Sequence, residues 1–137
     1  MVFDTATKIL ILGGLGALLV SFAFAYALAQ ARLADPEADR HLLLQVHVVT
    51  LWEGFMLLGL VWAVQFSDLT SGWETLAASL LVAAGALQAA ANTMAWRAGK
   101  TNLFAPPRGL NYKFATANAI FASIGLVILI LGCVEAL

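Results

Sequence analysis

The sequence predicts an all-α integral membrane protein built as a four-helix up-down bundle. Hydrophobic residues make up 62% of the 137 residues and charged residues only 11%, whereas a soluble domain needs far more polar surface around its core. Four apolar runs reach the length of about 20 residues with which a helix crosses a bilayer. They occupy most of the chain, so we expect one membrane domain over residues 1–137. The expected helices are Lys8–Ala31, His41–Phe66, Gly72–Trp96 and Tyr112–Val134.

The first run is predicted to be a retained helix. Its apolar stretch is longer than the core of a signal peptide, and Asp4 lies where such a peptide carries positive charge. None of the four runs alternates apolar and polar residues, so strands are not expected. Short polar links between the runs make sequential helices antiparallel neighbours.

The distribution of Lys and Arg predicts the orientation. The connections 32–40 and 97–113 lie on one side of the membrane and hold six of the seven basic residues: Arg32, Arg40, Arg97, Lys100, Arg108 and Lys113. Because cytoplasmic loops carry the excess of Lys and Arg, both connections are expected in the cytoplasm and both termini outside. The expected location is a bacterial inner membrane.

Charge and cysteine content exclude some classes of function. The net charge is −1 and no basic run occurs, so no nucleic-acid partner is expected. The single cysteine, Cys133, excludes an internal disulfide and any CxxC motif. We expect it to be a packing or lipid-depth thiol.

Small residues on two of the expected helices suggest close helix packing. Gly13, Ala17 and Ser21 recur at four-residue spacing, and Gly85 and Ala89 repeat the pattern on the third helix. Such faces allow two membrane helices to approach closely. Ala and Gly are also abundant throughout the chain, so the pattern can arise without that role.

Two polar residues deep in the second helix are the main functional candidates, because ionisable groups inside a membrane are costly and rarely without a role. Glu53 lies near the middle of this helix, and His47 precedes it by six residues. That spacing places the two side chains about 120° apart around the helix and about 9 Å apart along it. They therefore cannot hold one metal ion from within a single helix. They either serve different sites or, in a cyclic oligomer, face one flat cofactor from opposite sides.

The third helix carries a polar-edged stripe. Gln88, Asn92 and Trp96 follow one another at four-residue spacing, and Asn118 lies in the fourth helix. Buried amides either join helices by hydrogen bonds or line a site, and both interpretations stay open for Gln88 and Asn92. Trp96, next to Arg97 at the helix end, is also typical of an interfacial aromatic belt.

These motifs resemble those of small four-helix membrane isomerases, the family of styrene oxide isomerase and hydroxylaminobenzene mutase. Its second helix carries a histidine, five residues, then Asn-Gly and bulky apolar residues. Here His47 is followed after five residues by Glu53-Gly54-Phe55-Met56-Leu57-Leu58, with Glu in place of Asn. Asn92-x-x-x-Trp96 resembles the Asn-x-x-x-Tyr pair of the third helix, with Trp in place of Tyr. Arg108-Gly109-Leu110 resembles an Arg-Gly-Leu stretch before the fourth helix.

The resemblance implies a ferric haem b held between the protomers of a homo-oligomer, a trimer. His47 would be the ligand of the haem iron, and Glu53, Asn92 and Trp96 would line the substrate side. The implied reaction is a Lewis-acid isomerisation of a small hydrophobic aromatic substrate from the membrane lipid. It would convert an epoxide to an aldehyde, or a hydroxylaminoarene to an aminophenol, without net redox change. Glu53 adds a possible charge where the family has an amide, and Trp96 lacks the phenolic hydroxyl.

Two other functions remain open at this point. A small proton-coupled multidrug-type transporter also uses one intramembrane glutamate, a role that Glu53 would take. In those exporters the glutamate lies in the first helix, whereas the first helix here has no acid at membrane depth. The other is a non-catalytic haem-binding membrane subunit or electron carrier. A bis-histidine carrier needs histidines on facing helices, and the first, third and fourth helices contain none.

Overall fold

The computed structural model describes residues 4–37 and 39–137 and confirms the all-helical fold. Its four helices are α1 (Thr5–Ala34), α2 (His41–Gln65), α3 (Ser71–Arg97) and α4 (Leu110–Glu135). All four are long and apolar enough to cross a membrane. Large apolar side chains lie exposed along them, as in a protein whose outer surface faces lipid. Examples are Leu12, Leu19, Phe22, Ile120, Val127 and Ile130.

Local capping explains where α1 begins and where α3 ends. The backbone N–H of Thr7 donates to Asp4 Oδ1 at 2.6 Å, so α1 begins three residues before the apolar run. At the end of α3, Gly99 has φ +62°, a conformation that glycine adopts without strain. Lys100 N–H then donates to Ala95 O and Gly99 N–H to Trp96 O. This pattern closes a helix at a glycine.

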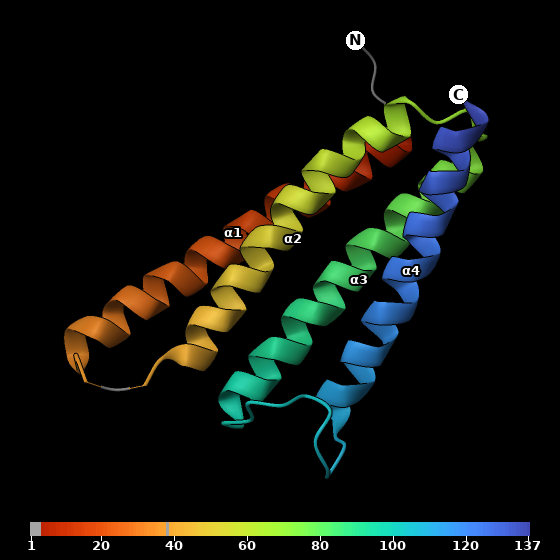
Figure 1. Cartoon of the computed structure of the whole chain (residues 1–137). Coiled ribbons are helices and arrows are strands. Elements are labelled where there is room, and N and C mark those ends of the chain that lie inside the picture. Colours follow the sequence, from red (N-terminus) through yellow and green to blue (C-terminus); the bar gives the residue numbers. More distant parts are fainter. Residues whose placement is uncertain (1–3, 38) are drawn as a thin grey trace.

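The helices form two antiparallel hairpins, α1 with α2 and α3 with α4 (Figure 1). α3 also contacts both α1 and α2, so it joins the hairpins. The Thr5 end of α1 and the Glu135 end of α4 lie at the same end of the bundle, and the connections after α1 and α3 lie at the other (Figure 1). The up-down topology predicted from the short links is therefore correct.

Glycines set the closest approach of α1 and α2. A Cβ on Gly14 would lie 3.0 Å from Gly54 O, and a Cβ on Gly54 would lie 3.1 Å from Gly14 O. The two backbones thus touch at this crossing, which only glycine permits. Gly13 packs against the side chain of Val82 in α3. The predicted small face of α1 therefore does contact neighbouring helices, although the backbone crossing itself uses Gly14.

The tightest apolar core lies in the half of the bundle that holds the termini. It comes from the first turns of α1 and α3 and from the second halves of α2 and α4. The opposite half also buries apolar residues such as Leu43, Val46 and Ala91, together with the polar Ser21 and Asn92, and the candidate site residues are found there and at mid-helix. The core residues are Ala6, Leu10, Leu57, Val64, Ala77, Ala78, Leu81 and Leu129.

Candidate functional site

His47 is held by α1 through a compact set of hydrogen bonds. Its Nδ1 lies 2.9 Å from Ser21 Oγ and 3.0 Å from Ser21 O. The Ser21 hydroxyl also donates to the His47 carbonyl oxygen at 3.1 Å. Ser21 is fully buried and His47 is half-buried. One ring nitrogen is therefore engaged by the protein, while Nε2 has no hydrogen-bond partner within the described part of the chain.

The other side of the His47 ring borders a groove on the outer face of α1 and α2. The groove measures about 410 Å³, and apart from His47 all its lining residues belong to the second half of α1. They are mostly small or apolar. The one cation among them, Arg32, lies at the end that the sequence predicts to face the cytoplasm. Such a surface suits a flat apolar ligand that carries negative charge at one edge. The lining residues are Ala25, Leu28, Ala29, Arg32, Leu33 and His47.

Glu53 faces α3 rather than the outer surface. A Cβ on Gly85 would lie 2.8 Å from Glu53 Oε2, so the missing side chain of Gly85 makes room for the carboxyl group. This oxygen is buried and has no hydrogen-bond partner among residues 4–37 and 39–137. A buried oxygen without a partner destabilises the fold by about 1–3 kcal/mol, which makes Glu53 a candidate functional residue.

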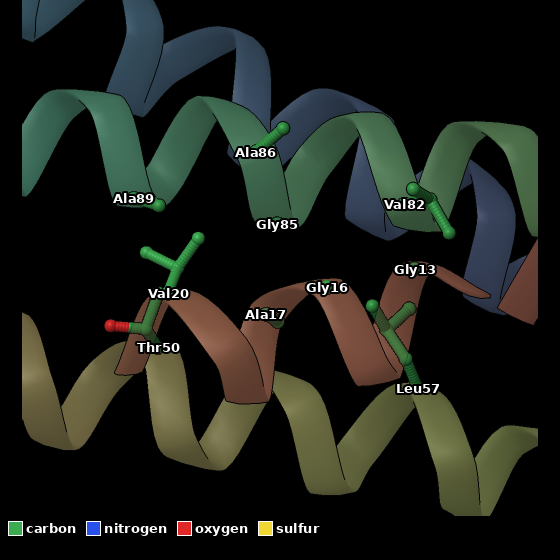
Figure 2. Close-up of a pocket in the computed structure, with 10 residues that line it drawn as sticks. All are labelled: Gly13, Gly16, Ala17, Val20, Thr50, Leu57, Val82, Gly85, Ala86 and Ala89. Carbon is green, nitrogen blue, oxygen red and sulfur yellow. The ribbon is translucent and has the colours of Figure 1, made fainter. Parts of the chain in front are cut away.

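An apolar pocket of about 190 Å³ lies beside Gly85, between α1 and α3 (Figure 2). Thr50 of α2 contributes its only polar side chain, and the Thr50 hydroxyl donates to Val46 O in its own helix. Apolar cavities of this size stay dry and admit single-ring aromatic molecules. The other lining residues are mostly small, which is why α1 and α3 enclose space here: Gly13, Gly16, Ala17, Val20, Leu57, Val82, Gly85, Ala86 and Ala89.

Asn92 and Trp96 lie further along α3, toward the connection 98–109. Asn92 is 4% exposed, and its Nδ2 has no partner in the described residues. It borders a small polar cavity together with Gln45 and Lys100. Trp96 meets the ring of Phe24 edge-on at 6.0 Å between centroids. Trp96 is thus a contact between α1 and α3 as well as a residue near the membrane interface.

Gln88 has a structural role, which decides between the two interpretations left open for it. The amide Nδ2 of Asn118 donates to Gln88 Oε1 at 2.6 Å and joins α4 to α3. Cys133 likewise packs against α2, where its thiol donates to Ala63 O at 3.4 Å. Neither residue contributes to the groove at His47 or to the apolar pocket.

The four predicted site residues do not form one cluster within a protomer. His47 contacts α1 whereas Glu53 contacts α3, as the 120° separation around α2 predicts. Asn92 lies seven residues, or about 10 Å, along α3 from the glycine that Glu53 contacts. In the described residues no three His, Cys, Asp or Glu side chains come together as a metal site. A haem iron can take a single histidine ligand, so a cluster of three is not required for the role expected of His47.

Three residues of the structure are not marked as site residues by the sequence. The sequence marks Ser21 only as a small residue and Arg32 only as a basic residue of a connection, because their nearness to His47 depends on the register of α1 against α2. Glu74, in the first turn of α3, is a second buried acid, 7% exposed. An acid in the first turn of an expected helix was the available signal.

Comparison of the chain with family models, with curated proteins and with solved structures gives no match.

Proposed function

We propose that this protein is a haem b-dependent membrane isomerase in which His47 ligates the ferric iron. The observation that carries the proposal is which partners the two ring nitrogens of His47 have. Nδ1 is bound to Ser21, Nε2 has no partner in the described chain, and the His47 side chain lines the groove. Metal-ligating histidines characteristically use one ring nitrogen for a backbone carbonyl and the other for the metal. The motif resemblance to the four-helix isomerases supports the same residue.

The groove at His47 fits the haem that this function requires. Its alanines give a flat apolar surface beside the imidazole, and Arg32 is placed to pair with a carboxylate at the edge of a haem. The groove covers only one face of a flat ligand, because it lies on the outside of the α1–α2 hairpin. We therefore propose that a second copy of the chain covers the other face, in a homo-oligomer such as the trimer that the resemblance implies.

Bound ferric haem would supply a Lewis acid that polarises an epoxide C–O or a hydroxylamine N–O bond. The apolar walls of the chain would exclude water from a cationic intermediate. The carboxyl group of Glu53 would stabilise positive charge in the substrate or move a proton. We propose that Asn92 and Trp96 shape the path by which the substrate reaches Glu53. The groove and the apolar pocket use different faces of α1, so His47 and Glu53 of one protomer do not face the same space.

Turnover of the haem-loaded protein in nanodiscs tests this function. Styrene oxide should give phenylacetaldehyde, or phenylhydroxylamine should give an aminophenol, without added oxidant or reductant. His47→Ala should remove this activity, and His41→Ala is the matched control because His41 is exposed at the start of α2. Haem binding without turnover of either substrate class would favour the non-catalytic haem subunit.

A second candidate is favoured by the buried, unpartnered oxygen of Glu53 next to an apolar pocket. This arrangement suits a proton-coupled transporter of small apolar compounds, in which one membrane carboxyl group alternately takes a proton and a substrate. Efflux from proteoliposomes under an imposed proton gradient distinguishes the two functions. The transporter should pump without haem and lose pumping in Glu53→Gln, whereas the isomerase should pump in neither form.

A further inference from the structure

We infer that Ser21 is a positioning residue that fixes the tautomer of His47, so that the neutral ring presents an unprotonated Nε2 to the groove. The inference deepens the proposed function, since the electron pair on Nε2 is what a ferric haem would bind. It concerns the protein's own hydrogen bonds, so it can be tested before any cofactor is added.

The argument begins with the number of protons available. The Ser21 hydroxyl has one hydrogen, and it donates to the carbonyl oxygen of His47 at 3.1 Å. When it donates there, it cannot also donate to His47 Nδ1, and Oγ, 2.9 Å from Nδ1, is then an acceptor for that nitrogen. The second neighbour of Nδ1 is the carbonyl oxygen of Ser21 at 3.0 Å, and a carbonyl oxygen only accepts. Both contacts are satisfied together only when Nδ1 carries the hydrogen.

The opposite tautomer would be unfavourable at this position. It would aim the lone pair of Nδ1 at that of Ser21 O, and the Ser21 hydroxyl could donate to Nδ1 only by giving up its bond to His47 O, inside an interface where Ser21 is fully buried. The Ser21 carbonyl oxygen would then face Nδ1 with no hydrogen between them, whichever way the hydroxyl turned. In the neutral ring the hydrogen therefore stays on Nδ1, and Nε2 keeps its electron pair.

The register of the helices explains why residue 21 has this role. Gly14 and Gly54 mark the backbone crossing of α1 and α2. Because the helices are antiparallel, Ser21 lies seven residues beyond this crossing on α1 and His47 seven residues before it on α2. Seven residues are close to two turns, so both side chains return to the shared interface. The short Ser21 side chain lets both its hydroxyl and its backbone oxygen reach the ring.

Nitrogen-15 NMR of histidine-labelled, haem-free protein in nanodiscs tests the inference. A His41→Gln background leaves His47 as the only histidine. One-bond N–H coupling should appear at Nδ1 and not at Nε2. Ser21→Ala retains the carbonyl but loses the hydroxyl, so signal from the Nε2–H tautomer should emerge. Ser21→Thr restores the hydroxyl and should restore the wild-type spectrum. Ser123→Ala, at an exposed serine of α4, should change nothing.

A second readout separates this inference from the proposed function. Haem titration should give a dissociation constant about tenfold higher for Ser21→Ala than for wild type, since loss of such an outer partner weakens metal binding 10–100-fold. A hydrogen on Nε2 in the wild-type protein would overturn the inference even if haem binds. Unchanged spectra and unchanged haem affinity in Ser21→Ala would also overturn it. A wild-type protein with the expected tautomer that binds no haem would instead contradict the proposed function alone.

Discussion

Gly54 of α2 lies against the backbone of Gly14 in α1, with space for no Cβ on either residue. A methyl group on Gly54 would come within 2.7 Å of the Leu18 side chain and 3.1 Å of Gly14 O. This contact fixes the register by which Ser21 meets His47 two turns away. The environment of the candidate haem ligand thus depends on a packing contact that is remote from it.

Gly54→Ala should therefore lower the free energy of unfolding by about 1–3 kcal/mol, the usual effect of overpacking. It should also weaken haem binding, because the hairpin must open where His47 is held. Unfolding in an SDS titration measures the first effect. Gly59→Ala is the matched control, since a Cβ on Gly59 would have no neighbouring atom within 4 Å. Equal stability of the two variants would show that the backbone contact is not formed.

Gly85→Ala should displace the carboxyl group of Glu53, because its Cβ would lie 2.8 Å from Oε2. The carboxyl stretching band assigned to Glu53 by comparison with Glu53→Gln should shift in infrared spectra of the Gly85→Ala protein. Gly16→Ala, whose Cβ meets nothing within 4 Å, should leave that band unchanged. An unshifted band in Gly85→Ala would place Glu53 away from α3.

Asn118→Ala should destabilise the α3–α4 hairpin by about 0.5–2 kcal/mol, the range for an amide hydrogen bond between membrane helices. The structural reason is the 2.6 Å contact from Asn118 Nδ2 to Gln88 Oε1. A double-mutant cycle with Gln88→Ala should show that the two effects are not additive. Haem affinity should be unaffected, since neither residue lines the groove at His47. Additive effects would mean that the two amides act separately.

The distribution of Lys and Arg predicts that the connections after α1 and α3 lie in the cytoplasm and the connection after α2 lies outside. In a Cys133→Ala background, Thr70→Cys should react with an impermeant maleimide added to intact spheroplasts. Thr101→Cys should react only after the membrane is opened. Both threonines are exposed, at opposite ends of the bundle. The reverse labelling pattern would contradict the positive-inside prediction.

The sequence was sufficient for the helices because spanning length and apolar composition are local properties. The structure extends α1 to Thr5–Ala34 and α4 to Leu110–Glu135, beyond the apolar runs Lys8–Ala31 and Tyr112–Val134. A capping aspartate explains the early start of α1. The divergence of His47 and Glu53 was also predictable, since it depends only on the helical period.

The partners of the candidate residues were not predictable, because they depend on interhelical register. Periodicity marks Ser21 and Gly85 as small residues but does not say which side chain each one meets. The contacts Ser21–His47 and Gly85–Glu53 appear only when α1, α2 and α3 are packed. Roles for Asn92 and Trp96 in substrate binding stay predictions.

The most direct test of the central claim is an absorption titration of the detergent-solubilised protein with ferric haem. Wild type and His41→Ala should develop a saturable Soret band with one haem per protomer, and His47→Ala should not. Added imidazole should restore the band in His47→Ala by supplying the missing nitrogen ligand. A Soret band of equal intensity and affinity in His47→Ala, or no saturable band in wild type, would contradict the assignment of His47 as the haem ligand.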